Sequence, residues 1–225
     1  MSASEPGAQR RWLALFDLDG TLTWHDTLLP FLMSFLRRNP SRLFGLWRLP
    51  LALASFAWRR DRGALKSQLI RMIMGGAARE AVDSCAGAFV DSLQPRKRFR
   101  AGALAALETH RTSGDLLVLL SASPDLYVPR VGRSLGFERT LCTQIAWRGD
   151  RLDGALVTPN RRGAEKLQCL HWLRAQYPGM PIVAYGNSAS DLDHMQHADR
   201  ALLVNANAAA RALAAKCGIP TTDWT

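Results

Sequence analysis

The stretch WLALFDLDGTLT, residues 12–23, places a short apolar run directly before two closely spaced carboxylates. An apolar run without alternation is typical of a strand that is buried on both faces of a parallel sheet. Asp17 and Asp19 follow this strand, and Gly20 allows the chain to turn tightly behind them. Carboxylates at i and i+2 can converge on one cation. Alone the turn is weak evidence of function, since Asp and Gly favour loops in any case.

Further apolar runs recur along the chain, at 116–120, 182–185 and 201–204. Between them lie patterns with helical periodicity, at 125–135, 164–176, 190–197 and 206–217. This alternation predicts an α/β fold with a parallel sheet and crossover helices, which binds ligands at the carboxyl ends of its strands. We also predict a hairpin of 141–147 with 151–157, in which Gly149 supplies the positive φ of the turn.

The segment 28–100 interrupts this alternation, and its apolar residues follow a helical period instead. Two sets of residues each share one predicted helix face: Leu65, Leu69, Met72 and Ile73, and then Val82, Cys85, Phe89, Val90 and Leu93. Gly75 and Gly76 separate the two predicted helices. We therefore expect a core domain of 1–27 and 101–225, with 28–100 inserted as a helical cap.

Positive charge is concentrated in this predicted cap. The chain has a formal net charge of +10, and between Arg37 and Arg100 fourteen basic residues face four acidic ones, which accounts for the whole excess. Within it the window 43–58 is the most apolar of the protein, yet it is too short and too interrupted, by Arg48 and Pro50, to span a bilayer comfortably. Two interpretations stay open: cap helices packed on the core with solvated arginines, or a surface for anionic lipid.

The N-terminal segment, the cysteines and the aromatic residues exclude several classes of protein. The polar start 1–10 lacks the apolar stretch of a secretory signal, which predicts a cytoplasmic protein, with the cap as candidate for contact with the inner membrane face. The four cysteines are scattered, without the spacing of a zinc site or a disulfide framework. Nucleic acid is not an expected partner, because exposed aromatics do not alternate with the basic residues. The oligomeric state is not predicted.

Four separate segments supply chemistry that suits a phosphate ester. Asp17 offers an attacking carboxylate, Ser121 follows an apolar run as a hydrogen-bond donor, and Lys166 offers positive charge. The run at 182–185 leads into Gly186, Asn187 and, four residues on, Asp191. Phosphoryl transfer needs a nucleophile, a donor, a cation and charge stabilisation. These segments supply the nucleophile, the donor, the stabilising charge and oxygen ligands for the cation.

Taken together, these four motifs resemble those of the haloacid dehalogenase superfamily, in the subfamily that includes the phosphoserine phosphatases. The resemblance covers nearly the whole chain: Asp17 to Thr23, Ser121, Lys166, and Gly186 to Asp191. It implies a Rossmann-like three-layer α/β/α core with an inserted cap. It also implies phosphatase rather than dehalogenase chemistry, because Asp19 is present and a halide leaves without needing a proton.

The resemblance also implies roles for single residues. Asp17 would be the covalent nucleophile, forming an aspartyl phosphate, and Asp19 the general acid and base. Mg²⁺ would be held by Asp17, the Asp19 carbonyl, Asn187 and Asp191. The residues implied to bind phosphate are Thr21, Ser121, Ala122 and Lys166.

One departure from the family pattern concerns the metal. Motif four usually begins Gly-Asp, whereas Asn187 stands here in place of that acid. An amide oxygen still coordinates a cation, but the site loses one negative charge and with it affinity. The alternative function is therefore a catalytically weak or inactive module, which would bind an acidic partner or a membrane surface through its basic cap.

The substrate is predicted only as a class. The run 31–50 resembles the corresponding region of phosphatidylglycerophosphatase C, a family member that hydrolyses a lipid phosphate. A lipid head group is therefore one candidate substrate, with residues 37–100 against an anionic membrane surface. A small phosphorylated metabolite such as phosphoserine is the other.

Overall fold

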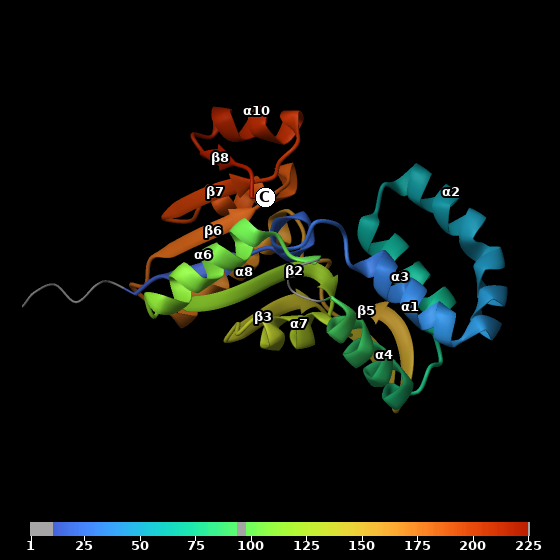
Figure 1. Ribbon diagram of the computed structural model, residues 1–225. Helices are drawn as coiled ribbons and strands as arrows, with labels where there is room; N and C mark the ends of the chain where they lie inside the picture. Colours follow the sequence, from blue (N-terminus) through green and yellow to red (C-terminus); the bar gives the residue numbers. More distant parts are fainter. Residues whose placement is uncertain (1–10, 94–97, 225) are drawn as a thin grey trace, which may run out of the picture.

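The computed structural model describes residues 11–93 and 98–224. Outside this description lie the polar start 1–10 and, from the basic segment, Arg96 and Lys97. A six-stranded parallel sheet forms the centre of the molecule, in the order β3-β2-β1-β6-β7-β8 (Figure 1). Its strands are β1 (Leu13–Phe16), β2 (Leu116–Pro124), β3 (Arg139–Thr143), β6 (Ile182–Gly186), β7 (Arg200–Val204) and β8 (Thr221–Thr222). The sheet and its parallel pairing confirm the predicted fold class.

Helices cover both faces of the sheet. Successive residues of β1 point to opposite sides: Ala14 and Phe16 join one apolar cluster, Leu13 and Leu15 the other. The first cluster includes residues of α6 (Ala101–Thr112) and α7 (Val128–Ser134). The second includes residues of α8 (Ala164–Gln176), α9 (Leu192–Met195) and α10 (Ala208–Lys216). The core is thus the three-layer α/β/α arrangement expected of a strand buried on both faces.

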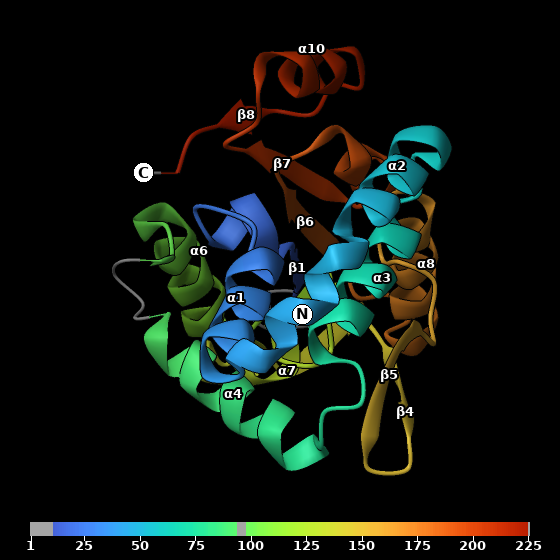
Figure 2. The same cartoon turned by 90° about the vertical axis from the view of Figure 1, so that its right-hand side faces the viewer.

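A helical segment projects from the carboxyl end of the sheet (Figures 1 and 2). It consists of α1 (Leu28–Arg38), the 3₁₀ helix η2 (Pro40–Arg48), α2 (Leu49–Arg59), α3 (Arg62–Met74) and α4 (Arg79–Ser92). Its two ends lie together, because Thr23 and Phe99 form an isolated antiparallel bridge. The boundaries of the cap at 28 and 100 stay a proposal. Phe31, Phe89 and Tyr127 pack ring against ring and join α1 and α4 to the core.

Helix faces in the cap agree in part with the sequence pattern. The pair of glycines at 75 and 76 separates α3 from α4, as predicted. On α4 the predicted face is buried at Val82, Cys85 and Phe89. On α3 the buried face differs, because Ile70, Ile73 and Met74 are buried whereas Leu65 and Leu69 line a cavity. One side of α3 packs on other cap helices and another side faces the cavity. A single apolar stripe therefore does not predict which of its residues are buried.

The predicted hairpin is partly wrong. Its turn is correct, with Gly149 at φ +58°, but the strands that it joins are β4 (Ile145–Arg148) and β5 (Arg151–Leu156). The residues before them, in β3, belong to the main sheet and pair with β2. Gln144, which lies between β3 and β4, is not a typical turn residue. The apolar pattern therefore continues from β3 into β4, and the sequence does not show where one strand ends and the next begins. The hairpin packs on α3, where Ser67 Oγ donates to Gly154 O at 2.8 Å.

The apolar window 43–58 is not a buried helix. It forms most of η2 and α2, and Ala52 is its one buried residue. Pro50 lies in the first turn of α2, where its missing N–H has no partner to lose, so it does not disturb that helix. Within the described part of the chain, every helix is too short or too polar to cross a bilayer.

Candidate active site

Asp17 is the first residue beyond β1, at the carboxyl edge of the sheet. Its N–H donates to Tyr185 O at 3.0 Å, which continues the pairing with β6. The chain then doubles back through a π-helical turn, Leu18–Leu22, and Thr21 Oγ1 donates to Asp17 Oδ2 at 2.9 Å. Gly20 has φ +83°, and a Cβ there would lie 2.0 Å from Asn187 Nδ2. A glycine is needed both for the turn and for the close approach of Asn187.

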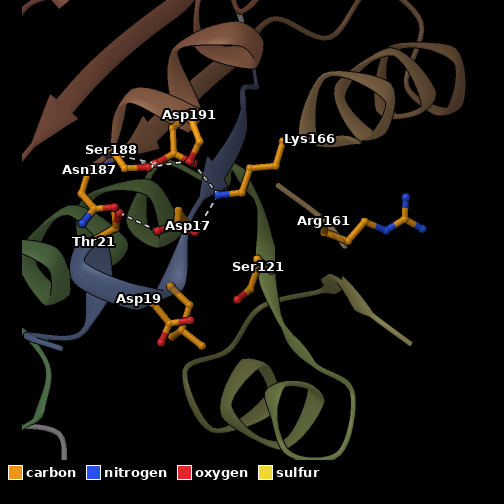
Figure 3. A network of polar contacts seen from close by, with 12 residues as sticks. Asp17, Asp19, Thr21, Ser121, Arg161, Lys166, Asn187, Ser188 and Asp191 are labelled. Atoms are coloured by element: carbon orange, nitrogen blue, oxygen red, sulfur yellow. Dashed lines mark hydrogen bonds and ion pairs between the residues drawn. The ribbon is translucent and has the colours of Figure 1, made fainter. Parts of the chain in front are cut away.

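Lys166 joins Asp17 to Asp191. Its Nζ donates to Asp17 Oδ1 at 2.6 Å and to Asp191 Oδ1 at 2.7 Å, and all three side chains are buried (Figure 3). Lys166 lies in the first turn of α8, and Asp191 ends the 3₁₀ turn η3 (Ala189–Asp191). Asp191 Oδ2 accepts from the Ser188 N–H at 3.0 Å and its hydroxyl at 2.7 Å. Residues far apart in sequence thus form one charged cluster.

The three charged groups of this cluster have differently shifted pKa values. Burial raises the pKa of Asp17 to about 6, although the Lys166 ammonium opposes the rise. Burial acts the same way on Asp191, but there the Lys166 charge and the hydrogen bonds from Lys166 and Ser188 together hold the pKa below the usual range. Burial lowers the pKa of Lys166, and the two carboxylates more than offset this, so it stays charged. One ammonium therefore serves two carboxylates, which leaves room for a further cation.

Asp19 is anchored by groups that sequence reasoning missed. Its Oδ1 accepts from the Thr27 N–H at 2.7 Å and the Thr27 hydroxyl at 2.6 Å, and its Oδ2 accepts from Ser123 Oγ at 2.6 Å. Tyr127 OH lies 2.7 Å from Thr27 Oγ1. Burial raises the pKa of Asp19 above its usual value. Thr27 directly precedes α1, so the start of the cap is tied to this carboxylate.

A cavity of about 610 Å³ opens over these groups, between the core and the cap. Six of the predicted site residues line it: Asp17, Asp19, Ala122, Lys166, Asn187 and Asp191. Thr21 and Ser121 are fully buried behind its wall. The hydroxyl oxygen of Ser121 accepts from the Ser123 N–H at 3.0 Å, which leaves the Ser121 proton free to be donated. The predicted site is therefore assembled at one place, with Thr21 and Ser121 in supporting positions.

Lys66 is a further cavity residue that the sequence interpretation overlooked. It projects from α3, is 9% exposed, and donates to Ala122 O and to Asn160 Oδ1. Burial lowers its pKa to about 8. A signal existed in the sequence, since Lys66 is the one cation among Leu65, Leu69 and Ile70. A buried lysine on an apolar helix face needs a polar partner, which here is the edge of the active site.

The expected ligands of Mg²⁺ are oxygen atoms around Asp17. In the described part of the chain, no three His, Cys, Asp or Glu side chains form a cluster that could hold a metal. The predicted set does not require one, because it includes a carbonyl of Asp19 and the amide of Asn187. Hard oxygen donors suit Mg²⁺, and the deficit of positive charge beside Asp17 suits any cation. These residues therefore fit a magnesium ion by the chemistry of their donors.

Comparison with known proteins shows the family of this chain. Residues 14–196 match the family model of the haloacid dehalogenase-like hydrolases, which spans most of the chain. The chain belongs to this family. Protein CicA of Caulobacter vibrioides is 33% identical over 189 residues, with 83% of each chain covered. A Streptomyces azureus protein named for inhibition of morphological differentiation is 26% identical over 220 residues, covering 95% of this chain and 79% of that protein.

Solved structures of similar fold include phosphatases. A Bordetella pertussis Tohama I protein of unknown function superposes with a TM-score of 0.78 at 20% identity, covering 96% of this chain and 99% of that one. A phosphoserine phosphatase, solved as an analogue of its phospho-aspartyl intermediate, has a TM-score of 0.64 at 14% identity, with 96% and 94% covered. At these identities the likeness concerns the fold.

Proposed function

We propose that the protein is a phosphomonoester phosphatase in which Asp17 forms a covalent aspartyl phosphate. The observation that carries this proposal is the position of the Asp17 carboxylate. It lies on the floor of the cavity, between Thr21 and Lys166, with the second buried acid, Asp19, two residues away. A nucleophile, a positive group and an acid with a raised pKa are the parts that such a reaction needs.

In the first step a carboxylate oxygen of Asp17 attacks phosphorus. The bond from phosphorus to the ester oxygen breaks, and that oxygen takes the proton of Asp19. The raised pKa of Asp19 supports this role, because it favours the protonated acid. In the second step water gives a proton to Asp19 and its oxygen attacks phosphorus. The bond to Asp17 then breaks, phosphate leaves, and both carboxyl groups return to their starting states.

Other residues hold the phosphoryl group during both steps. The Lys166 ammonium offsets its negative charge, and the free Ser121 proton and the Ala122 backbone supply hydrogen bonds. Thr21 holds Asp17 in place. Bound Mg²⁺, held by Asp17, Asp19, Asn187 and Asp191, would lower the repulsion between the phosphate and the nucleophile. Asn187 gives this set one charge fewer than an Asp would, so we propose weaker metal binding rather than its loss.

The cavity supports two substrate classes. Its lining includes apolar side chains, among them Trp24, Leu28 and Phe56, and the cations Arg62, Lys66 and Arg162. Such a lining suits a phosphate ester with an apolar part, as in a lipid phosphate, or with a second anionic group, as in a phosphorylated metabolite. The inactive module remains the alternative, and Asn187 is the observation that favours it.

A phosphomonoester screen with Mg²⁺ tests the proposal. It should include phosphoserine, lysophosphatidate and phosphatidylglycerophosphate, with Asp17→Asn as the matched variant. We expect phosphate release by the wild type alone, and an acid-stable, hydroxylamine-sensitive ³²P label on the wild-type protein. Release that survives loss of Asp17 would contradict the mechanism. Absence of turnover on every ester would support the inactive module.

A further inference from the structure

The outer side of the cap carries large apolar side chains in contact with solvent. Phe44 is 85% exposed, Trp47 68% and Trp58 88%. Leu43, Leu51 and Leu53 are exposed beside them. These six residues lie on η2 and α2, and we call them the η2–α2 surface. Figures 1 and 2 show α2 on the side of the cap away from the sheet. A cluster of this kind, rather than scattered single residues, marks a binding surface.

The sequence of α2 does not suit a helix left in water. From Leu49 to Trp58 it has no charged residue, and Ser55 is its one polar side chain. A helix that is apolar on nearly all sides is normally enclosed in a core. Here the inward side packs on α3 and contributes Phe56 to the cavity, while the outward side meets nothing among the described residues.

Positive charge surrounds this apolar surface. Residues 27–60 contain six arginines and no acidic residue. Five of the six are exposed and form no ion pair with any described residue: Arg37, Arg38, Arg48, Arg59 and Arg60. The guanidinium of Arg48 stacks 5.0 Å from the ring of Trp47.

Elsewhere in the basic segment several cations have partners within the protein. Arg71 pairs with Asp153 at 2.8 Å, and Arg79 lies 3.7 Å from Asp150 and stacks on Trp147. Lys66 is buried in the cavity. Of the described cations in this segment that are exposed and form no ion pair, five lie on or beside η2 and α2, where the apolar side chains are also exposed, and the other two are Arg62 and Arg98.

From this juxtaposition we infer that the η2–α2 surface docks on an anionic phospholipid bilayer. Apolar and aromatic side chains flanked by arginines match the boundary between acyl chains and negatively charged head groups. A second copy of this chain is disfavoured as the occupant, because two such faces would bring together the five exposed arginines of each copy, and residues 27–60 contain no acidic residue to pair with them. This inference goes beyond the proposed phosphatase function and does not depend on it.

Co-sedimentation of the full chain with vesicles tests the inference. The vesicles are phosphatidylcholine alone, or phosphatidylcholine with about 30% phosphatidylglycerol, a fraction that gives a strongly negative surface. We expect binding to the anionic vesicles that is at least about tenfold stronger than to the neutral ones, and that weakens in high salt. Asp17→Asn should bind like the wild type, which separates docking from catalysis.

Two sets of variants probe the two parts of the surface. The combination Phe44→Ser, Trp47→Ser and Trp58→Ser should lower binding by about tenfold or more, since it removes the inserted side chains. The combination Arg48→Gln, Arg59→Gln and Arg60→Gln should lower it and reduce its salt dependence. Trp172→Ser with Leu213→Ser is the matched control, because these exposed residues lie on α8 and α10. All the substituted positions are exposed, and an unchanged melting temperature verifies folding.

Three results would overturn the inference. The first is equal binding to neutral and anionic vesicles. The second is full binding by both folded triple variants. The third is a wild-type dimer in light scattering that the serine variant abolishes, which would assign the face to a second copy of the chain.

Discussion

Lys166 Nζ lies 2.6 Å from Asp17 Oδ1, in a pair from which water is almost completely excluded. The two residues are 149 positions apart, and the same ammonium also holds Asp191 at 2.7 Å. A buried ion pair of this kind does not by itself argue for high stability, since desolvation opposes the attraction. Its value here is that it fixes the direction of the Asp17 carboxylate.

Lys166→Met should abolish turnover and destabilise the fold. Without the ammonium two buried carboxylates face each other unpaired, and we expect a loss of about 3 kcal/mol in the free energy of unfolding. Guanidinium denaturation at pH 7.5 without Mg²⁺ measures it. The double variant Lys166→Met with Asp17→Asn should recover much of this loss. Equal stability of the single and double variants would contradict the electrostatic explanation.

Ser123→Ala should slow catalysis without weakening substrate binding. The Ser123 hydroxyl donates to Asp19 at 2.6 Å, so its removal frees the general acid to move and raises the pKa of Asp19 further. We expect kcat to fall about tenfold with little change in KM, and the alkaline limb of the pH–rate profile to move to higher pH. Ser134→Ala, which removes a hydroxyl bonded to Val131 O, is the control. A pH–rate profile that does not shift would contradict the proposal that Asp19 is the general acid.

Asn187→Asp should strengthen Mg²⁺ binding. A second charged oxygen ligand on β6's loop raises cation affinity by about tenfold, measurable by calorimetry. Without metal the same change should lower the free energy of unfolding by about 1 kcal/mol, since it adds a negative charge near Asp17 and Asp191. Asn207→Asp at the N-cap of α10, where either residue accepts from Ala210 N, is the matched control. A variant with unchanged affinity would show that residue 187 does not contact the ion.

Asp125→Asn should stabilise the protein in a pH-dependent way. Burial raises the pKa of Asp125 from 3.8 to about 6, so between these values the folded state binds more protons than the unfolded state. The Asp125 carboxyl therefore costs stability progressively as pH rises from about 4 to 6, and the cost is constant above. Asn keeps an oxygen to accept from the Ile145 N–H at 3.1 Å.

Because Asp125 is only half buried, we expect a gain of about 1 kcal/mol in the free energy of unfolding at pH 8. At pH 4 the gain should vanish. Urea titrations of both proteins at pH 4, 5, 6 and 8 give the comparison. A gain that is the same at every pH would mean that hydrogen bonding, not charge, sets the effect.

Much of the core was predictable because its signals are local. A run of apolar residues that ends at Asp17 marks a strand and its carboxyl end without knowledge of its neighbours. Ser121 and Asp191 likewise follow apolar runs, whereas the approach of Lys166 to Asp17 was anticipated from the resemblance to the haloacid dehalogenase superfamily. The boundary between β3 and β4 was missed because no turn residue stands at Gln144.

The groups around Asp19 were not predictable in this way. Thr27, Ser123 and Tyr127 are ordinary polar residues in the sequence, and only the meeting of α1 with β2 and the turn after it brings them to one carboxylate. Lys66 gave a local hint, but its partners Ala122 and Asn160 come from distant segments.

Local order alone determined the four apolar runs that became β1, β2, β6 and β7, and the acids that follow the first of them, since these depend on short-range patterns of apolar and polar residues. Only the tertiary structure decided how the window 43–58 is used. An apolar segment can be buried in the protein core, against another protein or in a membrane, and its composition is the same in each case. Which of these applies depends on the neighbouring elements that cover the segment. In this chain α3 covers one side of α2, while Trp58 on α2 and Phe44 and Trp47 on η2 remain exposed.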